Sequence, residues 1–270
     1  MPEVVEVEFL KNETASTFKG KRVIEAVLNN EKISNIDKIL FSKILTDETL
    51  VSTDRHGKIL ILNFTNNKHL LIHFLLTGYM KLIKEEEKDK SQAYLAFDNG
   101  LKCGIFGIMF QGFVKFYQEE DIHRIDEVAK LGVDVLSKDF TLEKFEALIA
   151  KFGNRTIKDL LIDQEIIAGL GNAYSDEVLF LSRVHPKRKC RELKKEEIEI
   201  IYNNIFAIIE KAKRFGGASE LSFVHLDGKR GEFHEHFLVH KKERCPICGS
   251  EIKTISASGR KAYFCPLCQK

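Results

Sequence analysis

The feature that constrains this chain most is a set of four cysteines near the end of the sequence. They form two Cys-x2-Cys pairs, Cys245 with Cys248 and Cys265 with Cys268, and sixteen residues separate the pairs. Four thiolates at this spacing can close a tetrahedral shell around Zn²⁺ and leave no coordination position open for chemistry. We therefore predict one structural zinc ion bound by these four cysteines.

The residues between the two cysteine pairs predict a hairpin over residues 251–264. Its tip carries Ser258-Gly259-Arg260-Lys261. A guanidinium can bind a phosphate through two parallel hydrogen bonds, and a metal-held hairpin would present that group rigidly. Arg260 is therefore a candidate phosphate-binding residue.

A second informative stretch is Pro2-Glu3 with Glu6 at the start of the chain. Removal of Met1 would give Pro2 a free secondary amine, and an α-amino group titrates near ~7.7–8.0, well below a lysine side chain. Such an amine can attack a sugar C1′ and form an iminium, and on a helix Glu3 and Glu6 would be close enough to transfer protons. The plainer alternative is a helix start with Pro2 at its first position and carboxylates that favour the helix dipole.

Composition places weaker limits on function. The formal net charge is +2, but residues 214–270 carry ten Lys and Arg against six Asp and Glu, and ten minus six gives a local excess of +4. This patch suits a polyanion without requiring one. No apolar run reaches the length of a membrane span, and the start of the chain lacks the pattern of a signal peptide. Cysteines at metal-site spacing fit a reducing compartment, so we expect a cytoplasmic protein.

An N-terminal helix is predicted over residues 4–18, and residues 22–117 consist of short β-type runs separated by turns. Asn66-Asn67 and Asn99-Gly100 are hairpin signals, and the charged run 84–90 fits a solvated hairpin loop. Regularly spaced short strands favour an antiparallel sandwich. The predicted strands are Val23–Leu28, Ile39–Leu45, Ile59–Phe64, His69–Phe74, Met80–Lys84, Ala93–Phe97 and Phe113–Tyr117.

Two loops in this half admit two interpretations each. Gly57-Lys58 directly precedes an apolar strand, and it is either an ordinary basic turn or a lysine presented to a ligand. The apolar stretch from Gly104 to Gly112 is either a buried strand with bulges or a loop that presents large side chains. The sequence pattern favours neither interpretation of the second stretch.

Beyond residue 138 the apolar period becomes helical. Thr141 is a predicted N-cap, two further helices flank the loop Ala168–Asn172, and residues 194–213 form a long amphipathic helix. Backbone N–H groups at the helix start beside Asn172 would suit an anion. The predicted class is α+β and multidomain, divided into an N-terminal β-sandwich domain over 1–118, a linker over 119–138, a helical domain over 139–240 and a zinc finger over 241–270.

Together these motifs resemble the formamidopyrimidine-DNA glycosylase/endonuclease VIII family of bacterial DNA-repair enzymes, and most nearly its formamidopyrimidine-DNA glycosylase branch. The resemblance covers the whole chain and rests on Pro2-Glu3 with Glu6, on Gly57-Lys58, on Ile157-Lys158 through Gly169-Leu170-Gly171-Asn172, and on the four cysteines. It implies a β-sandwich, a helix–two-turn–helix domain and a zinc finger. It also implies a bifunctional DNA glycosylase/abasic-site lyase of base excision repair that removes oxidised bases and cleaves the strand by β,δ-elimination. Formamidopyrimidine is the leading lesion, and 8-oxoguanine is a second candidate.

Carried over to this chain, the resemblance gives roles to four residues of the N-terminal half. Pro2 is the expected nucleophile that attacks C1′, expels the base and forms a Schiff base. Glu3 is the expected general acid/base, and Glu6 supports it. Lys58 is expected to hold the phosphate beside the lesion and to assist proton transfer.

The resemblance also implies phosphate contacts in the C-terminal half. Asn172 and Arg260 are expected to clamp backbone phosphates around a flipped nucleotide, and Arg260 is associated with δ-elimination. Arg155 and Lys158 are further candidates for phosphate contact. Flipping is needed because a base inside a duplex is out of reach of the nucleophile.

The chain departs from the family in the wedge that fills the gap left by the flipped base. Leu76, Phe110 and Gln111 align with a Met, an Arg and a Phe of the family pattern. Leu76 and Phe110 can still insert between stacked bases. The arginine that reads the opposite cytosine is missing, which predicts weak discrimination of the opposite base. The segment from Gly216 to Gly231, by contrast, resembles the lesion-capping loop of the formamidopyrimidine branch.

Two alternative functions stay open. The altered wedge suits an endonuclease VIII-like glycosylase for oxidised pyrimidines, and a non-catalytic relative could bind damaged DNA through its finger. In every case the expected partner is double-stranded DNA with damaged bases or abasic sites, and no membrane. We expect a monomer in a bacterial-type cytoplasm, associated with the nucleoid when bound to DNA.

Overall fold

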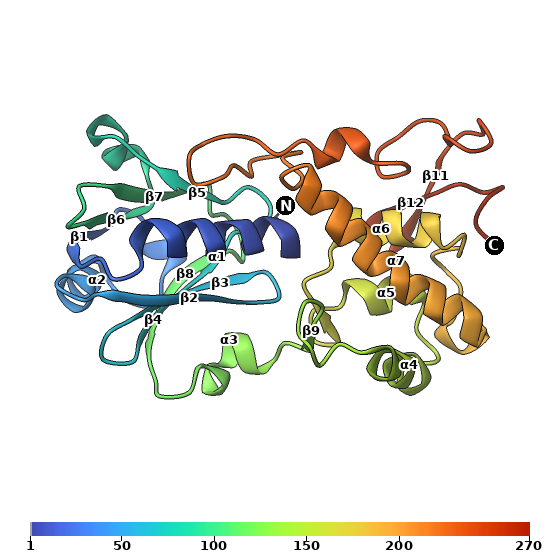
Figure 1. The fold of residues 1–270 in the computed structure, drawn as a ribbon, viewed down its shortest axis with the longest axis horizontal. Coiled ribbons are helices and arrows are strands. Elements are labelled where there is room, and N and C mark those ends of the chain that lie inside the picture. The colour runs from blue at the N-terminus through green and yellow to red at the C-terminus, as the bar shows by residue number, and fades with distance from the viewer. Residues whose placement is uncertain (1) are drawn as a thin grey trace. The chain divides into compact units, whose positions relative to one another are not determined.

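The computed structural model describes residues 2–270 and divides the chain into two compact units. The first unit runs to Lys130 and also includes Gly216–Glu232, and the second contains Leu131–Phe215 and Phe233–Lys270 (Figure 1). Segment 216–232 thus packs with the first unit, whereas the sequence pattern groups it with the helical domain. Over residues 2–270, no helix is long and apolar enough to cross a membrane.

The first unit begins with α1 (Val4–Phe18), which confirms the predicted helix. Its buried positions include Val7, Leu10, Thr14 and Phe18, so a stripe with helical spacing faces the interior. The chain turns directly after the helix at Gly20, whose φ of 77° suits a residue without a Cβ. In Figure 1 the dark blue α1 lies along the two sheets of this unit.

Two four-stranded antiparallel sheets form the predicted β-sandwich. One sheet has the order β1-β6-β7-β5, and the other has the order β2-β3-β4-β8. The strands are β1 (Val23–Leu28), β2 (Leu50–His56), β3 (Ile59–Phe64), β4 (Lys68–His73), β5 (Tyr79–Leu82), β6 (Ala93–Phe97), β7 (Lys102–Phe106) and β8 (Phe113–Gln118). The sequence does not predict β2, because its polar residues outnumber its apolar ones. β7 includes the first residues of the stretch from Gly104 to Gly112, for which the sequence pattern left a strand and a loop equally open.

Both predicted hairpin turns are confirmed. Asn66 and Asn67 have φ of 59° and 55° and join β3 to β4, and Gly100 has φ of 81° between β6 and β7. The turn at Asn66-Asn67 also sets the register of the hairpin, in which Ile59 pairs with His73 at the far end.

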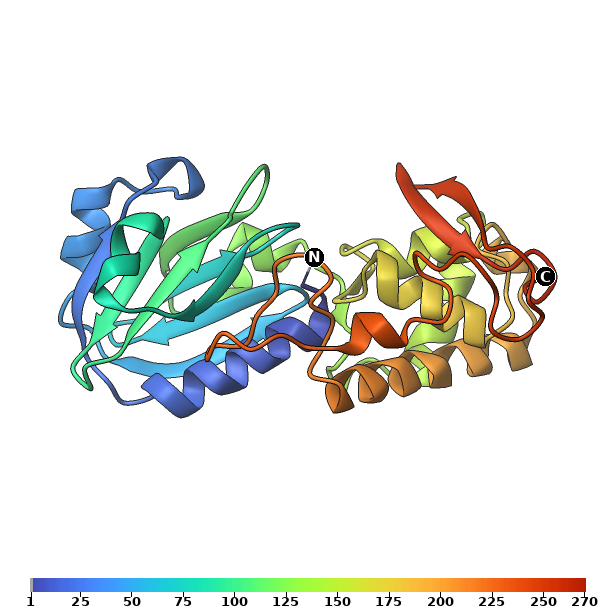
Figure 2. The same ribbon diagram turned by 90° about the horizontal axis from the view of Figure 1, so that it is seen from above.

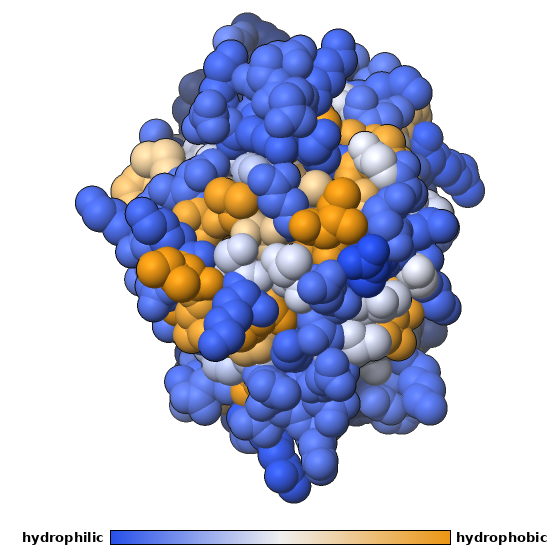
Figure 3. Space-filling model, turned by 90° about the vertical axis from the view of Figure 1, so that its left-hand side faces the viewer, coloured by the Kyte–Doolittle hydropathy of each residue, from blue (hydrophilic) through white to orange (hydrophobic). Residues whose placement is uncertain are grey.

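The strand predicted over residues 39–45 is wrong. This stretch is the helix α2 (Lys38–Leu45), which begins at Asp37, whose side chain accepts a hydrogen bond of 2.8 Å from the Leu40 N–H. Only Phe41 and Leu45, four residues apart, are buried, while Ile39 is 75% exposed. The exposed apolar residues give the run its strand-like appearance in sequence. Figure 3, in which the left-hand side of Figure 1 faces the viewer, shows apolar groups interspersed with polar ones on that face.

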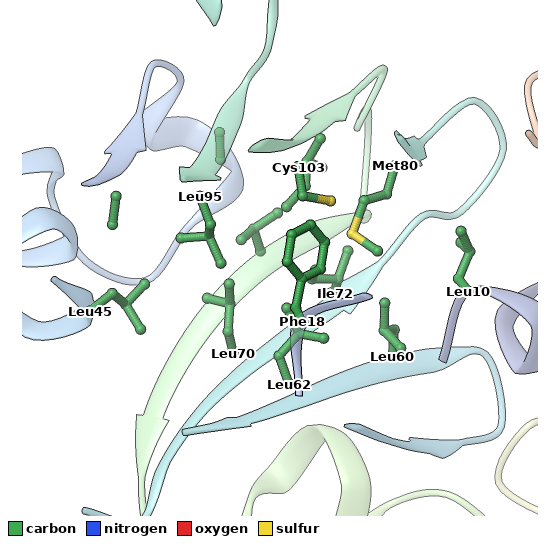
Figure 4. Packing of buried hydrophobic residues seen from close by; sticks show 14 of the residues in the cluster. Leu10, Phe18, Leu45, Leu60, Leu62, Leu70, Ile72, Met80, Leu95 and Cys103 are labelled. Atoms are coloured by element: carbon green, nitrogen blue, oxygen red, sulfur yellow. The ribbon is translucent and has the colours of Figure 1, made fainter. Parts of the chain in front are cut away.

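The core of the first unit lies between the two sheets and under α1. Figure 4 shows Leu10 and Phe18 of α1 among side chains from both sheets, including Leu62 and Ile72 from one and Leu95 from the other. Phe18 stacks on Phe97 with a ring-centroid distance of 4.2 Å. Because α1 packs into this core, its N-terminal end has a fixed position in the unit.

The connections of the first unit are short. The charged run 84–90 joins β5 to β6, which are not neighbours in the sheet, so the predicted hairpin loop is instead a crossover that contains the 3-10 helix η2 (Glu85–Lys90). None of its residues is buried, in agreement with a solvated segment. The other short helices are η1 (Glu31–Ile33), η3 (Ile122–Arg124) and α3 (Asp126–Ala129).

The second unit is mainly helical, as predicted. Thr141 is confirmed as an N-cap, because its Oγ1 accepts a hydrogen bond of 3.2 Å from the Lys144 N–H. Its elements are β9 (Val133–Asp134), α4 (Leu142–Lys151), α5 (Ile157–Ile162), β10 (Ile167–Ala168), α6 (Asn172–Leu181), η4 (Cys190–Glu192), α7 (Lys195–Arg214), η5 (Phe233–His236), β11 (Lys253–Ala257) and β12 (Arg260–Phe264).

Polar side chains that bond to the backbone fix the turns of this unit. Gln164 accepts from the Gly169 N–H at 3.0 Å and donates to the Leu170 carbonyl at 2.7 Å, which holds the loop between α5 and α6. Glu177 of α6 accepts hydrogen bonds of 2.7 to 2.9 Å from three consecutive backbone N–H groups at residues 238–240. Figure 2 shows the red hairpin β11–β12 beside the yellow α6.

Candidate active site and zinc finger

The start of α1 brings together three of the residues proposed for catalysis. Pro2 directly precedes the helix, and the backbone N–H of Glu3 donates a hydrogen bond of 2.7 Å to Oε2 of Glu6. Both glutamates are buried, with exposed fractions of 3% and 0%. This bond satisfies an N–H group at the helix end and orients Glu6 beside the proline.

The second carboxylate oxygen of Glu6 is bound by segment 216–232. The Ala218 N–H donates a hydrogen bond of 2.7 Å to Oε1 of Glu6. Gly217, with φ of 78°, permits this approach, since a Cβ there would lie 2.8 Å from the same oxygen. The sequence identifies Glu6 but gives no sign that residue 218 is its partner.

The chemistry of Pro2 depends on Met1. Pro2 is buried, and in a chain that carries Met1 its nitrogen is an amide nitrogen without nucleophilic character. The expected removal of Met1 concerns a position outside the described residues. A free proline amine arises only after that removal.

Lys58 occupies the tight turn between β2 and β3. Gly57 takes a φ of 57°, and Arg55 donates to the Gly57 carbonyl at 2.8 Å and to Oε2 of Glu8 at 2.9 Å. Because Glu8 belongs to α1, Arg55 links the Lys58 turn to the helix that follows Pro2. Lys58 is 5% exposed, so the turn is part of a packed site and not a free basic loop.

The structure adds His73, which sequence reasoning did not single out. His73 ends β4 and pairs in register with Ile59, next to Lys58. Burial, and after it the positive charge of Lys58, lowers the pKa of His73 to about 4, so its imidazole is neutral near pH 7. The hairpin turn at Asn66-Asn67 could have identified His73 from the sequence. That turn fixes which residues of β3 and β4 face each other, and so it places His73 opposite Ile59.

The three predicted wedge residues lie on two loops of the first unit that pack together. Thr77 Oγ1 donates to the Gly107 carbonyl at 2.6 Å, and a Cβ on Gly78 would lie 2.6 Å from Ile108. On these loops the exposed side chains are Leu76, Met109, Phe110 and Gln111. Phe110 is 78% exposed with φ of 56°, so the second half of the glycine-rich stretch is a loop that presents large side chains. Met109 is a further apolar residue that the sequence reasoning omitted.

In the second unit, Asn172 lies beside the hairpin that carries Arg260. Asn172 is the first residue of α6, and its Nδ2 donates a hydrogen bond of 2.8 Å to the Lys261 carbonyl. Among residues 2–270, its buried Oδ1 has no hydrogen-bond partner. Arg260 is exposed at the start of β12. The arrangement combines an exposed guanidinium with the N-terminus of a ten-residue helix, a combination suited to phosphate.

Lys158 and Arg155, the other two candidates for phosphate contact, are less available to a ligand than Arg260. Lys158 is fully buried, and its Nζ donates at 2.5 Å to Asp176, at 2.7 Å to Ser175 and at 2.8 Å to the Asn172 carbonyl. This burial corrects the expectation for Lys158, which holds α5 against the start of α6 and does not offer its charge to a ligand. Arg155 is 44% exposed along its side chain and pairs with Asp163.

The four cysteines of the predicted zinc site come together at the base of the finger hairpin. Their sulfur atoms all lie within 4.8 Å of one another, and they are the one group of this kind among the described residues. A set of four thiolates fits a tetrahedral zinc shell, so Cys245, Cys248, Cys265 and Cys268 hold one structural zinc ion. Cys103 and Cys190 lie outside the group, and burial raises the pKa of both thiols, that of Cys190 to about 11.

Three domain families match this chain. The "Formamidopyrimidine-DNA glycosylase N-terminal domain" matches residues 1–106, the "Formamidopyrimidine-DNA glycosylase H2TH domain" matches residues 131–223, and the "Zinc finger found in FPG and IleRS" matches residues 242–270. They occur in the same order as the β-sandwich, the helical unit and the finger described above.

Whole-length relatives agree with these matches. The chain is 31% identical to the formamidopyrimidine-DNA glycosylase of Streptococcus mutans over 274 residues, with 100% of both chains covered, and 32% identical to that of Mycoplasma mobile over 275 residues, with 100% of this chain and 99% of the relative covered. Among solved structures, a complex of Lactococcus lactis Fpg (MutM) with N7-benzyl-Fapy-dG DNA has a TM-score of 0.89 at 27% identity over 100% of both chains. MutM (Fpg) of Thermus thermophilus has a TM-score of 0.87 at 27% identity, over 99% of this chain and 98% of that one.

The chain therefore belongs to the formamidopyrimidine-DNA glycosylase family. Its enzyme class is that of a DNA glycosylase with abasic-site lyase activity, which acts in base excision repair on DNA. Its fold is the combination predicted from the sequence, antiparallel sheets followed by a helical domain and a four-cysteine finger.

Proposed function

We propose that this protein excises oxidised bases, formamidopyrimidine foremost, through an amine at Pro2, and that it then cleaves the DNA strand. The observation that carries the proposal is the hydrogen bond from the Glu3 N–H to Glu6, which fixes one of two buried carboxylates that lie within four residues of the proline. Once Met1 is removed, that proline would supply a secondary amine with proton-transfer groups beside it. The relatives' names, and the Fapy-dG and abasic-site DNA bound in the Lactococcus lactis complexes, support the same substrate class.

In this mechanism the Pro2 nitrogen bonds to C1′ and the base leaves with the electrons of the glycosidic bond. The nitrogen then loses its proton and the sugar ring opens at the C1′–O4′ bond, which gives an iminium. The iminium draws electrons from the sugar, so loss of a 2′ proton and then of the 3′ phosphate becomes easier. Glu3 would protonate the opened sugar oxygen, and Glu6 would keep Glu3 in position. Lys58, with neutral His73 beside it, would bind the phosphate next to the lesion.

Asn172 and Arg260 of the second unit would bind further phosphates of the DNA backbone. The hydrogen bond between Asn172 and the Lys261 carbonyl supports this pairing, because it joins the helix start to the hairpin of Arg260. Arg260 would also favour departure of the 5′ phosphate in the δ-elimination by stabilising its charge. Arg155 is a secondary contact at most, because Asp163 already partners its guanidinium.

The proposed covalent step can be tested by borohydride trapping on abasic-site DNA. Wild-type protein with a free Pro2 should form a covalent adduct. Pro2→Gly and a protein with a blocked N-terminus should lose most of it. An adduct of undiminished yield in both would assign the nucleophile to a lysine and contradict the proposal.

A second candidate specificity, for oxidised pyrimidines, is favoured by one observation. The exposed wedge residues Leu76, Met109, Phe110 and Gln111 include no cation to read an opposite base. A duplex panel containing formamidopyrimidine, 8-oxoguanine and dihydrothymine, assayed for base release and for strand cleavage, separates the two. Faster release of dihydrothymine would favour this second candidate, and binding of all three without release would indicate a non-catalytic relative.

We further propose that the protein acts as a monomer in the cytoplasm and associates with the nucleoid when it binds DNA. The support is its substrate, which requires access to chromosomal DNA, and a zinc site built from cysteines, which suits a reducing compartment.

A further inference from the structure

Segment 216–232 is fastened to α1 at two points by carboxylates of that helix. Glu6 accepts from the Ala218 N–H at 2.7 Å, and Glu13 accepts from the Leu226 N–H at 2.8 Å. Seven helical residues span about 10 Å, so both carboxylates lie on one face of α1, two turns apart. Residues 219–225 connect the two points, and one end of this connection lies beside the residues that follow Pro2.

His225 ties the same segment to α1 a second time. Its Nδ1 lies 2.5 Å from Oε1 of Glu13, and its Nε2 lies 2.9 Å from the Gly216 carbonyl. Gly216 has φ of 67° and begins the segment. One imidazole ring thus joins α1 to the glycine from which the segment starts.

Both partners of this ring accept hydrogen bonds. A carboxylate and a backbone carbonyl have no proton to donate, whereas a neutral imidazole has one donor and one acceptor nitrogen. The two contacts can exist together only when both ring nitrogens carry protons. The bridge therefore requires the imidazolium, and its loss of one proton breaks one of the two contacts.

The surroundings of the ring favour this charge. From α1 it faces Glu13 and the ring of Phe9, and from its own segment it faces Phe223, Asp227 and Lys229, while β5 contributes Leu82 to the same pocket. Lys229 is paired with Asp227 at 2.8 Å. The hydrogen bond with Glu13 is the largest cause that raises the pKa of His225 above its ordinary value. The bridge is complete below that ordinary value near 6.5 and is lost as the pH rises through the raised pKa.

The connection itself suits a base better than a phosphate. Between Ala218 and Gly228 its charged side chains other than His225 are acidic, Glu220 and Asp227. Acidic groups repel a phosphate backbone. Leu221 is 48% exposed. Arg230 donates hydrogen bonds to the carbonyls of Ser219 and Leu221, and these bonds hold the backbone at this exposed apolar residue.

We propose that the His225 imidazolium is a positioning group that clamps segment 216–232 to α1, so that the clamp supports release of a damaged base but is dispensable for cleavage at a site that has already lost its base. The inference rests on the proposed function, because it assumes that the base is expelled beside Pro2.

The clamp can first be tested without DNA, by hydrogen exchange of backbone amides at pH 6 and pH 9, corrected for intrinsic rates. In the wild type we expect protection of residues 218–226 to fall about tenfold between these pH values. In His225→Gln, whose amide has no titration in this range, protection should be the same at both. A wild-type segment with unchanged protection, or a His225→Gln segment that loses protection as the wild type does, would overturn the clamp.

The second measurement compares single-turnover release of formamidopyrimidine with cleavage of a pre-formed abasic site. His225→Ala and Glu13→Gln should slow base release about tenfold and leave abasic-site cleavage within about twofold. The ratio of the two rates should fall with rising pH in the wild type and stay flat in His225→Gln. Lys21→Gln, a change at an exposed side chain of the first unit outside this segment, should alter neither rate.

The outcomes separate the clamp from the function on which it depends. Equal losses of both rates in His225→Ala would indicate a merely structural residue and would overturn the positioning role. A wild-type protein that releases no base and cleaves no abasic site would contradict the proposed function instead, while the hydrogen-exchange result would still decide whether the clamp exists.

Discussion

The side-chain amide of Asn172 donates a hydrogen bond of 2.8 Å to the backbone carbonyl of Lys261, 89 residues further along the chain. It joins the first residue of α6 to the hairpin that carries Arg260. Ser258, at the tip of the same hairpin, donates at 2.6 Å to Asp159 of α5. The finger is thus held against the starts of two successive helices, and Arg260 has a defined position relative to Asn172.

Removal of this link should weaken DNA binding without unfolding the protein. We expect Asn172→Ala to lower the affinity for an abasic-site duplex roughly tenfold, which corresponds to the loss of one or two hydrogen bonds. Fluorescence anisotropy at fixed salt measures the change. Asn204→Ala is a matched control, since Asn204 bonds to Ser182 at 3.0 Å within the same unit but away from the finger. Equal affinities for Asn172→Ala and the wild type would refute the role.

Lys158 should act on stability and not directly on phosphate binding. Removal of one partner of a buried ion pair leaves the other charge uncompensated, so Lys158→Met should lower the free energy of unfolding by about 3–5 kcal/mol. Lys158→Met with Asp176→Asn removes both charges and should recover part of that loss. Urea denaturation gives the values. A stable Lys158→Met protein with weakened DNA binding would instead restore Lys158 as a phosphate contact.

Zinc removal should affect the finger and spare the first unit. A chelator should release about one zinc per chain, abolish tight DNA binding and leave the β-sandwich folded, because the metal closes only the site of Cys245, Cys248, Cys265 and Cys268. Metal analysis and circular dichroism follow the two effects, and added zinc should reverse them. Cys103→Ser and Cys190→Ser serve as controls that should keep the zinc content of the wild type.

His73 should make stability depend on pH in the acidic range. Its pKa in the folded protein, about 4, lies below the unfolded value near 6.5, so the unfolded chain binds the proton more readily between these values. This contribution of His73 to the free energy of unfolding is full above pH 6.5 and is lost as the pH falls towards 4, by an amount on the order of 3 kcal/mol. His73→Gln should flatten this part of a stability profile measured by urea unfolding. A mutant profile that is as steep as the wild type would contradict this assignment.

Phe110 should matter for the reaction and not for folding. Its ring is 78% exposed and its φ of 56° suits glycine, so Phe110→Gly should leave stability unchanged or raise it by about 0.5 kcal/mol. Base release from a damaged duplex should fall about tenfold if the ring fills the space of the flipped nucleotide. Leu101→Ala, at an exposed hairpin turn of the same unit, is the control for a general loss of apolar surface. Base release at the wild-type rate in Phe110→Gly would exclude Phe110 from the wedge.

The elements that the sequence predicts well have local causes. α1, the hairpin turn at Asn66-Asn67, the N-cap at Thr141 and the cysteine pairs each depend on neighbouring residues, whose spacing is visible in the chain. The stretch 39–45 is mispredicted because its outward-facing Ile39 and Leu40 hide the helical spacing of Phe41 and Leu45. The conformation of this stretch depends on which of its side chains are buried against the rest of the protein. The amino-acid composition of the stretch does not indicate which these are.

The parts of the site that the sequence could not predict depend on long-range contacts. Glu6 and Ala218 are 212 residues apart, and so are Glu13 and His225. The burial of Lys158 depends on Asp176 and Ser175 of the next helix, which turns an apparent phosphate ligand into an internal ion pair. A single sequence gives no indication of such long-range pairings. Residues such as Pro2, Lys58 and Arg260 can be recognised as site candidates without them, because their residue type and neighbours are enough.

The inclusion of residues 216–232 in the first unit has a consequence for how the protein is made. Synthesis up to residue 130 completes the strands of the β-sandwich, yet Glu6 and Glu13 still lack the backbone donors that are added with Ala218 and Leu226. These two carboxylates of α1 therefore reach their final geometry only after most of the second unit has been translated. A fragment that ends at residue 130 would contain the nucleophile without this geometry, so a prematurely terminated chain should be poorly equipped to attack DNA.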